Sequence, residues 1–174
     1  MNETTRVIEA QPRSGFEIYR AKGTTPEIRM MVFVVLAGRR WRAVLDDNLR
    51  KIGQSSARLE ALAAIINSPN PSSQSDIAKR LRIEGPTMTR MIDSLTRDGL
   101  VERRAAPGDR RTKHLVVTPM GEQVLEQMFA IVDPLRDRLT GALSPDDVER
   151  LTLVLGDMIG RLDRGIPDEA GDAL

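Results

Sequence analysis

The sequence predicts a mainly α-helical protein with one small β-hairpin near its middle. Aromatic residues make up only 3% of the 174 residues, and helix-forming residues dominate, which favours helices over sheets. Apolar residues recur at helical spacing in most segments. Two short β-prone runs, residues 100–104 and 113–117, flank the turn sequence Pro107-Gly108-Asp109, which predicts a hairpin.

The N-terminal part predicts an arm and then a long helix. Residues 1–25 show no lasting periodicity, so we expect an arm that is either disordered or laid across a partner subunit. Thr25 as N-cap and Pro26 in the first turn predict the start of a helix that ends at Gly53. Residues 30–37 of this helix are apolar on all sides, which is untypical of the surface of a monomer. We therefore expect a second subunit to cover them.

Two shorter helices are predicted before the hairpin. Ser55 can cap the first, and its apolar stripe consists of Leu59, Leu62, Ile65 and Ile66. Residues 67–71 are rich in helix breakers and predict a loop. Residues 72–75 offer caps for a second, short helix, and its inner face carries Ile77, Ala78 and Leu81.

The next helix, which starts at Pro86 and ends before Gly99, has one apolar and one polar face. Apolar residues recur on it at i, i+3, i+4 and i+7: Met88, Met91, Ile92 and Leu95. Its other face is small, polar and partly basic: Thr87, Thr89, Arg90, Asp93, Ser94 and Arg97. Together with the short helix before it and the hairpin after it, this helix predicts a winged helix-turn-helix over residues 54–117.

This arrangement suits double-stranded DNA. An α-helix fits the major groove, where short donors such as threonine approach the base edges. The hairpin tip carries Arg110 and Arg111, and arginines are attracted into narrow minor grooves. Two alternatives stay open: the tip arginines are merely solvated, or Arg90 forms a structural ion pair with Asp93.

Two more helices are predicted in the C-terminal part. Thr118 caps the first of them, and Pro134 should bend it because proline removes one backbone hydrogen bond. Ser144 and Pro145 begin the last helix. An acidic tail, residues 166–174, follows it.

The charges are spread unevenly, although the net charge is only +1. Residues 1–71 hold 11 Lys or Arg against 7 Asp or Glu, a net of +4, and residues 72–117 hold 10 against 6, again +4. Residues 118–174 hold 5 against 12, a net of −7. A basic centre beside an acidic end is typical of a protein that presents one face to a polyanion. Solvated charges that happen to segregate are the alternative.

The composition excludes several classes of function. The chain has no cysteine, which excludes disulfides, zinc-finger ligands and thiol redox sensing. The one histidine, His114, lies in a predicted strand of the hairpin, where we expect a surface or hydrogen-bonding role. With no catalytic constellation and no phosphate-cradling glycine loop, we expect no enzyme, no cofactor and no metal site. The start lacks a signal peptide and residues 30–37 are too few to cross a bilayer, so we expect a soluble cytoplasmic protein.

Three stretches carry a resemblance to a known family: residues 83–90, 95–101 and, above all, 108–121, which begin Gly-Asp-Arg-Arg-Thr-Lys. They resemble the MarR family of bacterial regulators, in particular its SlyA-like branch. The resemblance implies a homodimer in which helices of residues 26–53 and 118–165 interleave. Its two lobes would read a palindromic operator with half-sites about 10 bp apart. It also implies a ligand-responsive regulator, most often a repressor.

The resemblance further assigns roles to residues of the two helices before the hairpin. Thr87, Thr89 and Arg90 would contact bases or adjacent phosphates. Ser73 and Gln74 would bind phosphates from the start of the short helix.

The resemblance also implies roles for residues of the hairpin and of the effector site. Arg110 would enter the minor groove with Arg111 beside it, and Asp109 would brace the hairpin through a neighbouring arginine. The implied effector is a small aromatic molecule or an aryl-CoA thioester. Trp41 can stack on such a ligand, with core packing as its alternative role, and Leu59 stands where many relatives carry an aromatic residue near the effector pocket. A winged helix that binds another protein without DNA readout is the alternative function.

Overall fold

The computed structural model describes residues 14–20, 23–68, 72–106 and 109–166, without the side chains of residues 19, 106 and 109–112. Within these residues, helices dominate and two antiparallel strands form a small sheet, which confirms the predicted fold class. The chain divides into two compact units, Met1–Arg58 and Leu59–Leu174.

The first unit begins with a short helix, α1 (Gly15–Arg20), inside the segment expected to be an arm. Its first turn is closed by reciprocal hydrogen bonds. The Ser14 N–H donates to Glu17 Oε2 at 3.1 Å, and the Glu17 N–H donates to Ser14 Oγ at 3.2 Å. Ser and Glu at this spacing form a capping box. The rest of the predicted arm, residues 1–13, lies outside the described residues.

The long helix α2 (Pro26–Leu49) continues into a short 3-10 turn, η1 (Arg50–Ile52). Thr25 caps α2 as predicted, because its Oγ1 accepts the N–H of Ile28 at 3.3 Å. Gly53 ends the segment as predicted, with a φ of 69° in the left-handed region that favours glycine.

The end of α2 also supplies a cap for the next helix, α3 (Ser56–Ile66). Asp46 Oδ1 accepts the backbone N–H of the buried Ser56 at 2.7 Å. This hydrogen bond lowers the pKa of Asp46 below its ordinary value of 3.8, because it favours the ionised carboxylate. Ser55 takes part as predicted by accepting the N–H of Arg58 at 3.3 Å.

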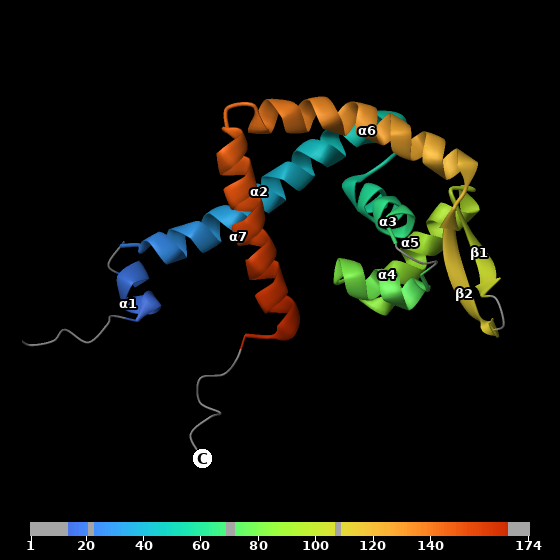
Figure 1. The fold of residues 1–174 in the computed structure, drawn as a ribbon, viewed down its shortest axis with the longest axis horizontal. Coiled ribbons are helices and arrows are strands. Elements are labelled where there is room, and N and C mark those ends of the chain that lie inside the picture. Colours follow the sequence, from blue (N-terminus) through green and yellow to red (C-terminus); the bar gives the residue numbers. More distant parts are fainter. Residues whose placement is uncertain (1–13, 21–22, 69–71, 107–108, 167–174) are drawn as a thin grey trace, which may run out of the picture. The chain divides into compact units, whose positions relative to one another are not determined.

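The second unit contains the winged helix, which consists of α4 (Gln74–Leu81), α5 (Gly85–Arg97) and the hairpin of β1 (Val101–Ala106) and β2 (Asp109–Val117). Figure 1 shows the hairpin beside α5, and β1 packs on α5 while β2 packs on α4. The strands pair from Val101↔Val117 to Ala105↔Lys113 and extend farther toward the tip than predicted. The core of the winged helix comprises fully buried side chains from α3, α4 and α5: Leu62, Ile77, Met88, Ile92 and Leu95.

Thr118 joins the hairpin to the next helix, α6 (Pro119–Thr140). Its Oγ1 donates to the Gly99 carbonyl at 2.6 Å and accepts the Gly121 N–H at 3.0 Å. Its own N–H donates to the Leu100 carbonyl at 3.0 Å. A Cβ added to Gly121 would lie 2.1 Å from that carbonyl oxygen, so only glycine allows the approach.

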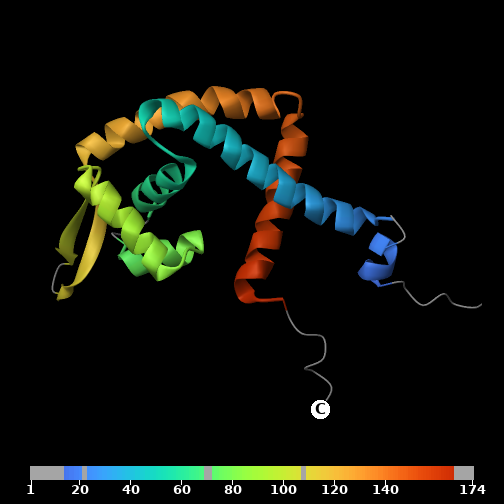
Figure 2. The same cartoon turned by 180° about the vertical axis from the view of Figure 1, so that it is seen from behind.

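Two long helices, α6 and α7 (Pro145–Arg164), complete the chain. Figure 2 shows α6 running as one helix from the end of β2, and its helical bonding continues past Pro134. Ser144 caps α7 as predicted by accepting the Asp147 N–H at 3.1 Å. No helix of the described part of the chain is long and apolar enough to span a membrane.

Candidate nucleic-acid interface

The outer face of α5 is the centre of the candidate interface. Met88, at 0% exposure, packs into the core, whereas Thr87, Thr89 and Arg90 on the other face are exposed. Pro86 lies in the first turn, as predicted. The helix thus presents an exposed polar side and packs its apolar side into the core.

The start of α4 lies against the hairpin. Ser73 and Asp76 form a capping box, in which Ser73 Oγ accepts the Asp76 N–H at 3.3 Å and Asp76 Oδ2 accepts the Ser73 N–H at 2.9 Å. Hydrogen bonds from Ser73 hold the pKa of Asp76 below its ordinary value. Backbone bonding also extends the sheet, because the Leu115 N–H donates to the Ser72 carbonyl at 2.9 Å and Ser73 bridges to His114.

A chain of polar side chains crosses this surface from β1 to α5. Arg103 Nη2 donates to Asp93 Oδ1 at 2.7 Å and to Gln74 Oε1 at 3.3 Å. Gln74 Nε2 donates to Thr89 Oγ1 at 2.8 Å, and Thr89 Oγ1 donates to the Gly85 carbonyl at 3.0 Å. The structure therefore brings together Gln74 and Thr89, two residues for which the family resemblance implies separate DNA contacts.

Asp93 has a different partner from the one considered on sequence grounds. Its carboxylate pairs with Arg103 on β1, while Arg90, three residues earlier on α5, has an exposed side chain. Arg103 is not among the site residues predicted from the sequence. The one signal for it was strand alternation, which places Arg103 on the opposite face of β1 from Glu102 and Arg104.

The tip of the hairpin contains the remaining predicted contacts. The backbone of Asp109, Arg110 and Arg111 belongs to β2. Their side chains lie outside the described residues, so the minor-groove contact and the bracing by Asp109 stay predictions. Nearer the base of the hairpin, Arg104 pairs with Glu102 on the same strand.

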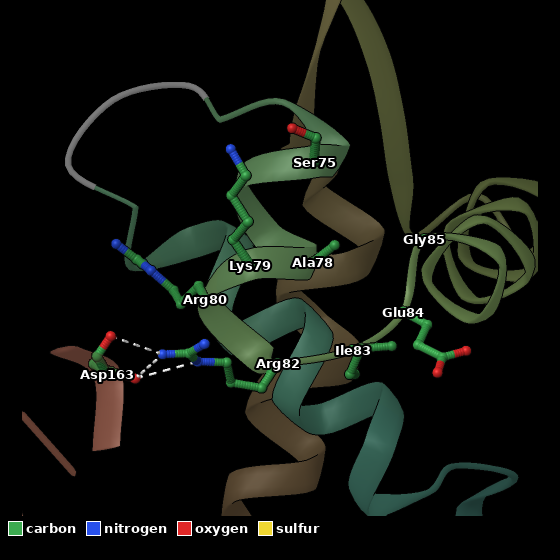
Figure 3. Close-up of a pocket in the computed structure, with 9 residues that line it drawn as sticks. All are labelled: Ser75, Ala78, Lys79, Arg80, Arg82, Ile83, Glu84, Gly85 and Asp163. Atoms are coloured by element: carbon green, nitrogen blue, oxygen red, sulfur yellow. Dashed lines mark hydrogen bonds and ion pairs between the residues drawn. The ribbon is translucent and has the colours of Figure 1, made fainter. Parts of the chain in front are cut away.

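A pocket of about 970 Å³ lies at the turn between α4 and α5 (Figure 3). At this turn Arg82 adopts a left-handed conformation with a φ of 53°. Its guanidinium reaches Asp163 of α7, with Arg82 Nε 3.2 Å from Asp163 Oδ1 and Nη2 3.5 Å from the Asp163 carbonyl oxygen. Lys79 and Arg80 add two more cations to the lining of the pocket, and Figure 3 shows the side chains of Arg80 and Arg82 extending from the end of α4.

Neither residue of the predicted effector site lines this pocket. Trp41 is half-buried on α2 in the first unit, and Leu59 is a buried residue of α3 at the start of the second. The effector site therefore stays a prediction. Across the described ranges, no three His, Asp or Glu side chains gather as metal ligands.

Comparisons with known proteins find similarity to transcriptional regulators. Residues 53–112 match the family model of the MarR family. The crystal structure of the transcriptional regulator PA3341 is 29% identical, with a TM-score of 0.71 over 78% of this chain and 99% of that chain. A mutant of MarR from E. coli in complex with operator DNA is 25% identical, with a TM-score of 0.66 over 75% of this chain and 94% of that chain.

A third structure supports the fold alone. The transcriptional regulator BldR from Sulfolobus solfataricus is 24% identical, with a TM-score of 0.70 over 78% of this chain and 95% of that chain. The matches are thus to transcriptional regulators of the MarR type, and they support DNA binding rather than catalysis.

Proposed function

We propose that this chain is a ligand-responsive transcriptional regulator, a repressor, that binds a palindromic operator in the cytoplasm as a homodimer. The observation that carries the proposal is the exposed polar face of α5, which stands above a fully buried apolar stripe and beside the hairpin. This geometry suits a helix that enters the major groove. The Asp-Arg-Arg sequence of residues 109–111 favours the SlyA-like branch of the family.

Dimerisation is supported by apolar surface that the chain does not cover. Residues 30–35 of α2 are all exposed, and so are most apolar residues of α7. Exposed apolar patches of this kind mark interaction sites in proteins. A second copy of the same chain would bury both and would place two winged helices against one duplex.

The proposed mechanism of release is a shift between two spacings of the recognition helices. A small aromatic molecule or aryl-CoA thioester that prefers the spacing unsuited to the operator would draw the protein off the DNA. A difference of a few kcal/mol in ligand affinity between the two states suffices for this shift.

The test measures binding of the purified protein to DNA from the promoter next to its own gene, by fluorescence anisotropy. Phosphate contacts predict that affinity falls by about 1,000-fold or more between about 50 and 200 mM salt. Arg110→Ala should weaken operator binding by about 10-fold, while analytical ultracentrifugation still finds a dimer. Unchanged operator binding in this variant would remove the proposed role of the hairpin.

The same experiment separates this function from the alternative, a winged helix that binds protein. A shallow salt dependence with no preference for the promoter over unrelated DNA would favour the protein-binding module. Thermal-shift measurements with aromatic acids and their CoA thioesters then address the effector, because a ligand that binds only the folded state raises the melting temperature.

A further inference from the structure

The polar contacts between Arg103, Gln74 and Thr89 have a fixed direction. A guanidinium has five donors and no acceptor, so the atom of Gln74 that faces Arg103 at 3.3 Å must be the oxygen Oε1. The amide nitrogen Nε2 must then face Thr89, where it donates at 2.8 Å. Arg103 therefore fixes the orientation of the Gln74 side-chain amide.

The same chain of bonds occupies the Thr89 hydroxyl. Its hydrogen goes to the Gly85 carbonyl at 3.0 Å, and its oxygen accepts from Gln74. Thr89 cannot donate to DNA unless it gives up its bond to Gly85. Gln74 Nε2 carries two hydrogens; one goes to Thr89, and the other makes no hydrogen bond within the described residues.

We propose that Arg103 is a positioning residue for sequence readout: it makes Gln74 present an N–H donor to an acceptor on a base edge, in place of the phosphate contact that the family resemblance implies for Gln74. This inference rests on the proposed function. Guanine offers two acceptors, O6 and N7, in the major groove and thymine offers O4, whereas cytosine offers the N4 donor. A fixed N–H donor thus favours guanine or thymine over cytosine at one position of each half-site.

Asp93 keeps Arg103 in place for this task. Its carboxylate accepts from the same nitrogen, Nη2, at 2.7 Å, and the Arg103 side chain is only 34% exposed. Without Arg103, the amide can make a half-turn about its terminal torsion, which is broad and roughly two-fold, as soon as the Thr89 hydroxyl turns its hydrogen from the Gly85 carbonyl to the Gln74 oxygen. In the molecules that make this half-turn, the Gln74 oxygen would face DNA in place of the nitrogen.

The test compares Arg103→Met with Arg104→Met. Both variants lose one positive charge from neighbouring positions of β1, but Arg104 pairs with Glu102 and has no part in the network. Competition binding would measure relative affinities for operators in which each base pair is changed in turn. Arg103→Met should weaken the preference at one position per half-site by about 10-fold, whereas Arg104→Met should keep it.

Two further variants separate positioning from folding. Arg103→Lys retains a donor-only group and should restore the preference. Gln74→Glu can still accept from Arg103 but has no N–H, so it should lose the preference at the same position as Arg103→Met. Circular dichroism would check that all four variants melt as folded proteins.

The outcomes distinguish the inference from the function beneath it. If the wild-type protein selects a sequence and Arg103→Met and Gln74→Glu select it with the same preference, the inference is overturned and the proposed function stands. If the wild-type protein selects no sequence, the proposed function falls, and the inference falls with it.

Discussion

The helices α5 and α7 have the same apolar periodicity, but the apolar stripe of α5 is buried and that of α7 is exposed. On α5 the stripe residues Met88, Ile92 and Leu95 are all 0% exposed, whereas on α7 Leu155 and Ile159 are 40% and 59% exposed. The difference is that α3, α4 and the hairpin supply a partner surface for α5 within the same chain. Periodicity therefore identifies the face that needs covering, but it does not identify what covers it. The apolar stripe of α5 is covered within one chain, whereas that of α7 is left exposed in the described part of the chain.

The largest effect should come from a charge on the uncovered stripe. Leu155→Asp would place a carboxylate in the proposed interface twice, once from each subunit, and an unpaired buried charge costs several kcal/mol. We expect a monomer by analytical ultracentrifugation at concentrations where the wild-type protein is a dimer. Arg150→Asp, which puts the same group on the polar face of α7, is the control and should stay dimeric. A dimeric Leu155→Asp would show that α7 lies outside the interface.

A cavity in the covered stripe should have the next largest effect. Ile92→Ala removes three methyl or methylene groups from a site with 0% exposure, and such truncations cost about 2–5 kcal/mol. Urea unfolding at one fixed protein concentration would measure the loss. Thr87→Ala on the exposed face of α5 is the control and should change stability by less than about 0.5 kcal/mol. Equal losses in the two variants would mean that the core of the winged helix is not where the structure places it.

The smallest effect concerns a cap rather than a stripe. Asp46→Ala removes the acceptor for the Ser56 N–H, which should cost about 1 kcal/mol at neutral pH. Because folding lowers the pKa of Asp46, the stabilisation from the carboxylate is present above 3.8 and is lost as the pH falls through the lower folded pKa. Chemical unfolding at pH 7 and at low pH should thus show the two proteins converging in acid. A difference that persists unchanged in acid would contradict the role of the ionised group.

The sequence anticipated the parts of the fold that depend on neighbouring residues. Thr25, Ser144 and Gly99 end or begin helices as predicted, because caps and left-handed turns act within one helical turn. It did not anticipate α1 (Gly15–Arg20), although Ser14 and Glu17 stand at capping-box spacing, since six residues are too few to show a periodicity.

Contacts between residues that are distant in the chain could not be predicted from the sequence. Asp93 has arginines nearby on its own helix, yet it pairs with Arg103, ten residues away on β1. Gln74 meets Thr89 across 15 residues, so two positions that the family resemblance treats separately share one set of hydrogen bonds. Such pairs depend on how α4, α5 and the hairpin pack, and local spacing does not encode that packing.

The junction at Thr118 has a mechanical consequence. Gly121 contacts the Leu100 carbonyl closely, so the first turn of α6 is packed directly against the base of the hairpin. Thr118 bonds to both segments, through the Gly99 carbonyl and the Gly121 N–H. A tilt of α6 would therefore displace the hairpin that is joined to its first turn. Because β1 packs on α5 and β2 packs on α4, the whole winged helix would move together with the hairpin.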